Sequence, residues 1–147
     1  MGFLRRGLPL AALLSIISGC AATDNPRLPW AFNAPRAEGY AIDLVNVKPA
    51  PGTPLAAGTL VEFLVKVNYS LSVASRGTIV LVFENEKNKV KAPEITRRVA
   101  SPGGEVTLRE RITVPDDAKE LRLFIPLVPQ YAVHTTGEVT IRYPIEH

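Results

Sequence analysis

Few side chains in this 147-residue chain are suited to acid–base or nucleophilic chemistry. The only histidines are His134 and His147, and Cys20 is the single cysteine. A serine or cysteine nucleophile needs a positioned base, and His134 stands in a threonine-rich segment, HTTG, without a directly flanking carboxylate. The chain also has no Gly-x-Ser-x-Gly, His-Glu-x-x-His, P-loop or Gly-x-Gly-x-x-Gly motif. We therefore expect no enzymatic activity, no metal site and no cofactor.

Glu110 is the carboxylate with the most unusual predicted position. It falls on the same face of a predicted strand as the apolar residues Leu108 and Ile112. A carboxyl on such a face needs a partner, or its pKa rises, and paired carboxylates on adjacent strands are the groups that hydrolyse glycosides. We expect a β-bulge or a buried pair with an arginine at Glu110 rather than catalysis.

Basic residues recur with the two-residue period of an extended strand at Lys87, Lys89 and Lys91, and again at Arg109 and Arg111. Such rows can bind anionic envelope polymers, lipopolysaccharide phosphates or nucleic acid. Lysines also protect an edge strand from sheet-to-sheet aggregation, and we favour this second role because acidic residues lie close by in the sequence. No aromatic residues alternate with the basic ones, so the pattern does not favour single-stranded nucleic acid.

The first 20 residues have the features of an export signal. Arg5 and Arg6 form a positive start, and residues 7–19 are uncharged. As a helix this stretch would be roughly 20 Å long, too short for a bilayer core of about 30 Å but suited to the apolar region of a signal peptide. Without the two arginines, 15 basic and 14 acidic side chains leave a net charge of +1, which does not favour a nucleic-acid partner.

The leader ends in Ile17-Ser18-Gly19-Cys20, an aliphatic residue and two small residues before a cysteine. This segment resembles the lipobox of bacterial lipoproteins. The resemblance implies cleavage before Cys20, acylation of the cysteine, and a lipid anchor in the cell envelope. The alternative is an ordinary secreted protein with an incidental Cys20. Ala21 stands where an aspartate would favour the inner membrane, so we expect the outer membrane, on its periplasmic or surface face, if the source is Gram-negative.

Residues 20–38 form a predicted tether between the anchor and the folded domain. Three prolines interrupt any helical or alternating pattern in this segment. Trp30 and Phe32 are unexpected in a linker. They either fold back onto the domain, which we favour, or await a partner, so both are candidate partner contacts.

From Gly39 onward, apolar and polar residues alternate, which is the period of half-buried β-strands. The segment 61–69, VEFLVKVNY, is the clearest example, and 78–83 is apolar on both faces, as in a central strand. Further strand segments are predicted within 40–47, 84–91, 97–100, 106–114, 121–127 and 138–145.

Three local features of these strands can be checked in the structure. Val65 and Leu81 stand in the middle of apolar rows, so we expect both in the core. The turn sequence Ser101–Gly104 predicts a hairpin over 97–104. Pro126 interrupts a strand that should be central, so it predicts a bulge or an edge.

About seven one-sided strands without a long helix predict an all-β protein in which two sheets pack face to face. The pattern resembles the immunoglobulin-like or fibronectin type III-like modules of bacterial envelope proteins, especially in the opening VKPAPGTPLAAGTLVEFLVKVNY. The cysteine pair and core tryptophan of antibody domains are absent. The predicted organisation is a signal peptide over 1–19, the acylated cysteine and Pro-rich tether over 20–38, and an immunoglobulin-like two-sheet sandwich of about seven strands over 39–147.

These features together predict a lipid-anchored envelope protein that is a non-catalytic binding or structural module. Its expected partners are the membrane, through the N-terminal lipid anchor, and another envelope protein or a glycan, but no nucleic acid. The alternative function is glycan or peptidoglycan binding, which requires exposed aromatic side chains on one patch. The aromatic residues that qualify are Trp30, Phe32, Phe124 and Tyr131.

Overall fold

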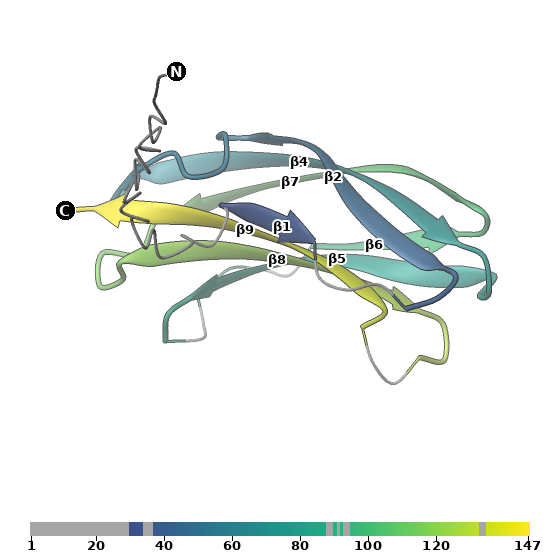
Figure 1. Ribbon diagram of the computed structural model, residues 1–147. Helices are drawn as coiled ribbons and strands as arrows, with labels where there is room; N and C mark the ends of the chain where they lie inside the picture. Colours follow the sequence, from purple (N-terminus) through teal and green to yellow (C-terminus); the bar gives the residue numbers. More distant parts are fainter. Residues whose placement is uncertain (1–29, 34–36, 88–89, 91, 93–94, 133–134) are drawn as a thin grey trace, which may run out of the picture.

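The computed structural model describes residues 30–33, 37–87, 90, 92, 95–132 and 135–147. All regular elements in these ranges are β-strands (Figure 1). The predicted leader with Cys20, and also Lys89, Lys91 and His134, lie outside the described residues. The strands are β1 (Ala31–Asn33), β2 (Tyr40–Lys48), β3 (Leu55–Ala56), β4 (Leu60–Leu71), β5 (Arg76–Asn85), β6 (Ile95–Ala100), β7 (Gly103–Thr113), β8 (Glu120–Pro129) and β9 (Gly137–Glu146).

The strands form two sheets that pack face to face (Figure 1). One sheet has the order β2-β4-β7, and the other has the order β1-β9-β8-β5-β6, with the short β3 parallel to β9. The seven long strands divide three and four between the sheets, while β1 and β3 are short additions beside β9. The predicted all-β, immunoglobulin-like sandwich of about seven strands is therefore confirmed.

The core consists of the inward-facing rows of both sheets. Because strand side chains alternate between the two faces, buried residues recur at every second position over much of β4, β5, β8 and β9. On β4 this row contains Phe63, Val65 and Val67, all 0% exposed, and on β5 it contains Leu81, also 0% exposed. The predicted core positions of Val65 and Leu81 are confirmed. Other fully enclosed members are Leu108, Leu121, Leu123, Ile125, Leu127, Val139, Ile141 and Tyr143.

An aromatic cluster joins the two sheets. Phe63 on β4 packs against Phe83 on β5 and Tyr143 on β9, with ring centroids 5.4 Å apart in each pair. Tilted and edge-on ring pairs are favourable beyond the area that they bury. The Tyr143 hydroxyl donates a 2.8 Å hydrogen bond to the carbonyl of Pro49, and burial raises the pKa of Tyr143 well above its usual range.

The connection between β6 and β7 corrects the predicted hairpin over 97–104. β6 pairs with β5, whereas β7 pairs with β4 in the other sheet. At the crossing, the carbonyl of Pro102 accepts a 2.9 Å hydrogen bond from the Leu71 N–H at the end of β4. Turn residues specify that the chain bends, but they do not specify which neighbour the next strand pairs with. Each strand here joins the open edge of a different sheet.

Pro126 also differs from its prediction. β8 lies between β5 and β9, so Pro126 is in a central strand rather than at an edge. Pairing with β9 runs through Pro126, opposite Glu138, without a shift. Pairing with β5 stops after Leu127 and resumes at Phe124 in the same register. Proline has no N–H to give to the ladder, and the sheet accommodates this as a local gap instead of a bulge.

Leu81→Ala should lower the free energy of unfolding by about 2–5 kcal/mol, because it leaves a cavity in a closed core. Leu60 is the matched control, since the same substitution there removes the same atoms from a side chain that is 67% exposed. Leu60→Ala should change stability by less than about 0.5 kcal/mol. Urea unfolding followed by circular dichroism measures both variants, and equal losses would contradict the placement of Leu81.

Candidate functional site

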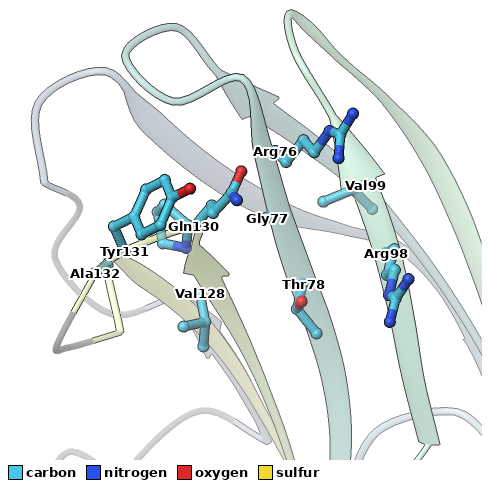
Figure 2. Close-up of a pocket in the computed structure, with 10 residues that line it drawn as sticks. Arg76, Gly77, Thr78, Arg98, Val99, Val128, Gln130, Tyr131 and Ala132 are labelled. Atoms are coloured by element: carbon cyan, nitrogen blue, oxygen red, sulfur yellow. The ribbon is translucent and has the colours of Figure 1, made fainter.

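A groove of about 480 Å³ lies on the outer face of the β1-β9-β8-β5-β6 sheet, at the end where β8 leads into β9 (Figure 2). Strands β5, β6 and β8 and the segment after β8 form its walls. The side chains that give the groove its chemistry are Arg76, Thr78, Arg98, Val128, Gln130 and Tyr131.

Strand register places three of these side chains in one row across the sheet. Thr78 on β5 lies opposite Arg98 on β6 and opposite Val128 on β8. Their chain neighbours Gly77 and Val99 are buried, so alternation turns the row toward solvent. Since neighbouring strands are about 4.8 Å apart, the row spans about 10 Å.

Arg76 and Gln130 lie in the next row, nearer the end of the sheet. The Arg76 carbonyl accepts a 2.8 Å hydrogen bond from the Gln130 N–H. Arg76 and Arg98 are diagonal neighbours on adjacent strands, a separation over which long side chains can reach a common ligand. In Figure 2, Gln130 and Tyr131 lie on the β8 side of the groove and Arg98 on the β6 side, with Thr78 between them.

The groove is positively charged without an internal counter-charge. None of the residues that line it is acidic. Elsewhere in the described part of the chain, five basic residues are paired with carboxylates. Within those same ranges neither Arg76 nor Arg98 has such a partner. As far as the described residues extend, both guanidinium groups can therefore meet an anion from outside the chain.

Tyr131 is presented at the rim of the groove. Its side chain is 93% exposed, and its φ of 67° lies in the left-handed region that residues other than glycine rarely adopt. The turn is closed by the Ala132 N–H, which donates a 3.1 Å hydrogen bond to the Pro129 carbonyl. A left-handed residue costs about 1–2 kcal/mol, and strain of this kind collects at binding sites.

Trp30 docks on the sandwich although it stands in the predicted tether. Its carbonyl accepts a 2.7 Å hydrogen bond from the Arg142 N–H. The indole lies over Gly52, where a Cβ atom would come within 2.6 Å of the ring. Trp30 therefore contacts the sandwich but is not buried as the fold-back prediction requires, since 43% of the residue stays exposed. Phe32 follows in β1 and pairs with Thr140 of β9.

The guanidinium of Arg142 lies 5.9 Å from the centroid of the Trp30 ring. Glu120 holds this guanidinium in place, since one carboxylate oxygen accepts hydrogen bonds from both Nε, at 3.0 Å, and Nη2 of Arg142. The bonds to Glu120 raise the pKa of Arg142 above its ordinary value. A fixed cation over an indole contributes about 0.5–1 kcal/mol at an exposed site.

Gly52→Ala should displace Trp30, because the added methyl group would occupy the position of the indole. The fluorescence of this single tryptophan should then be quenched more strongly by acrylamide. Gly58 is the matched control: its φ of 71° is close to the 76° of Gly52, and a Cβ there meets nothing within 4 Å. Both variants should lose about 1–2 kcal/mol through backbone strain. Unchanged quenching in Gly52→Ala would contradict the docking.

The basic residues grouped by the sequence lie in separate surroundings. Lys87 lies in the turn after β5, not on an edge strand as expected. It pairs at 3.1 Å with Asp117 and lowers the pKa of that carboxyl. Arg111 pairs at 3.2 Å with Glu62, while Arg109 is exposed on β7. The alternative that these residues form rows of free, anion-binding cations therefore finds no support at Lys87 or Arg111.

Glu110 has neither of its two expected environments. The pairing of β7 with β4 is continuous, so there is no bulge at this residue. One Glu110 carboxylate oxygen accepts a 2.8 Å hydrogen bond from the Arg111 N–H, and among the described residues no arginine forms an ion pair with it. Since β7 is an edge strand, the half-buried side chain reaches a backbone donor and solvent instead of the core.

The sequence did not indicate Arg76 and Arg98 as a pair. They come from different strands and share no motif, and they become neighbours only through the register of β5 with β6. Tyr131 was expected as an exposed aromatic residue, and its exposure is confirmed. Phe124 is another of the aromatic candidates. It lies on the outer face of β8 and is half-buried.

The described residues contain neither a candidate metal site nor a membrane-spanning helix. Within these ranges no group of three or more His, Cys, Asp or Glu side chains could hold a metal ion. In the same part of the chain, no helix is long and apolar enough to cross a membrane. The arginine groove is the feature there with the clearest binding chemistry.

No protein-family model matches the chain, and no curated protein matches it. Among solved structures, it is similar to the CARDB domain of a Pyrococcus furiosus protein, crystallised in complex with di-metal ions. The sequences are 12% identical, the match covers 77% of this chain and 94% of that chain, and the TM-score is 0.49.

Proposed function

We propose that this chain is a lipid-anchored protein of the bacterial cell envelope and that its sandwich is a non-catalytic binding module. The observation that carries the binding role is the groove, where two guanidinium groups without an acidic partner among the described residues and a 93% exposed aromatic ring border one depression. Arginine and tyrosine are enriched among residues that dominate binding energy. A concave site with a few convergent polar groups is the usual form of a ligand site.

The leader supports the anchoring half of the proposal. Cleavage before Cys20 and acylation would leave residues 21–29 between the lipid and Trp30. The span from Cys20 to Trp30 reaches at most about 35 Å when fully extended. Because Trp30 packs on the sandwich, residues 21–29 would be the free part of the proposed tether 20–38, and this length would keep the domain close to the membrane.

The docking of Trp30 also supports presentation of the groove away from the anchor. Trp30 lies beside Arg142, whereas the groove lies beside the start of β9 at Gly137. The stretch of β9 from Gly137 to Arg142 is about 17 Å long. A partner that approaches the domain from outside the membrane can therefore reach the groove.

Glycan or peptidoglycan binding is the second candidate, and the position of Tyr131 favours it. That ring is one of the aromatic side chains that such a function requires, and it borders a groove with hydrogen-bonding groups. Trp30 and Phe32 stay candidate partner contacts, with Trp30 partly exposed. We also propose the outer membrane as the location if the source is Gram-negative.

Cys20→Ser should abolish acylation, because the thiol that accepts the lipid is lost. Metabolic labelling with an alkyne fatty acid should mark the wild-type chain and leave the variant unlabelled. The variant should also keep its leader or leave the membrane fraction. Ser18→Ala is the control, since it keeps a small residue before the cysteine and should be labelled normally. Equal labelling of wild type and Cys20→Ser would refute the anchor.

A further inference from the structure

We propose that the groove bordered by Arg76, Arg98 and Tyr131 binds an anionic saccharide whose sugar units carry carboxylates. This inference rests on the proposed function, because it names the ligand class of the same groove. It is carried by two cations, an exposed ring and hydrogen-bonding groups that share one surface and that have no side-chain partner in the described part of the chain.

The arginines supply the selectivity for an anion. A guanidinium binds a carboxylate through two parallel hydrogen bonds, a geometry that a neutral hydroxyl cannot match. Arg76 and Arg98 lie diagonally on adjacent strands, so they can hold one carboxylate between them or two successive ones. No acidic side chain lines the groove to compete with the ligand.

A sugar ring can contact Thr78 in the middle of the groove and Gln130 and Tyr131 on the side away from Arg98. The Thr78 hydroxyl and the Gln130 amide face the groove, and within the described residues neither has a protein hydrogen-bond partner. Both groups can donate to and accept from sugar hydroxyls. Tyr131 offers an aromatic face on which the C–H side of a sugar can pack.

The direction of the groove favours a saccharide over an acidic peptide. A peptide that adds a strand would pair with the free edge of β6, beyond Arg98 and away from Tyr131. The groove instead crosses β6, β5 and β8 over about 10 Å. A ligand that touches both Arg98 and Tyr131 must lie across the strands, as a short oligosaccharide can.

The test is calorimetric titration of the mature protein, purified from its native host in a non-ionic detergent. The probes are trigalacturonate, the neutral trisaccharide maltotriose and the peptide triglutamate. Trigalacturonate should bind at least about tenfold more tightly than either of the others, and added salt should weaken its binding. Equal binding of maltotriose would show that the groove does not recognise the negative charge. Equal binding of triglutamate would show that it does not recognise the sugar. Either result, or no binding of trigalacturonate, would overturn the proposal.

Variants locate the binding in the groove. Arg76→Gln and Arg98→Gln should each weaken trigalacturonate binding about tenfold or more, whereas Arg109→Gln, the same change on an exposed residue of the other sheet, should not. Tyr131→Phe should bind normally. Tyr131→Gly should lose binding while its thermal midpoint is unchanged or higher, because glycine accepts the left-handed backbone. Normal binding by both arginine variants would refute the site.

The titration is independent of the anchor. If Cys20→Ser is acylated like wild type, the proposed envelope function fails even when trigalacturonate binds. If acylation is confirmed and trigalacturonate does not bind, only the inference about the ligand fails.

Discussion

The packing of Phe63 between the two sheets is the contact on which the rest of the structure depends. Its ring comes from the three-stranded sheet and touches Phe83 and Tyr143 of the opposite sheet. With one cysteine in the chain, no intrachain disulfide can join the sheets, so apolar burial must hold them together. This core fixes β5 and β9, and β8 between them. The outward residues of β5 and β8, which build the groove, are positioned by the same packing.

The sequence predicted those parts of the fold that follow from the two-residue period. Burial on one face enforces this period, so the rows containing Val65 and Leu81 could be placed before any pairing was known. Three of the wrong predictions concern pairing partners. The β6–β7 connection, the regular ladder around Pro126 and the edge position of Glu110 depend on which strands lie side by side, and no local pattern determines that.

The candidate site was harder to predict for the same reason. The sequence grouped Lys87 with nearby lysines, but a carboxylate from another strand connection neutralises it. Conversely, no motif or spacing in the sequence links Arg76 with Arg98, and they become neighbours only through strand register. Tyr131 and Trp30 could be noted as aromatic residues in loop or linker sequence. Only the structure shows that the first ring is presented at the groove and the second lies against Gly52.

In the proposed complex, the outer end of the larger sheet, and not the tether, contacts the saccharide. Proton–nitrogen correlation spectra of the acylated protein in micelles, recorded as trigalacturonate is added, test it most directly. The largest shifts are expected at the Nε groups of Arg76 and Arg98 and at the backbone amides of Gln130 and Tyr131, with little change at the Trp30 indole. Shifts centred on Trp30 and Arg142, with the groove resonances unmoved, would contradict it.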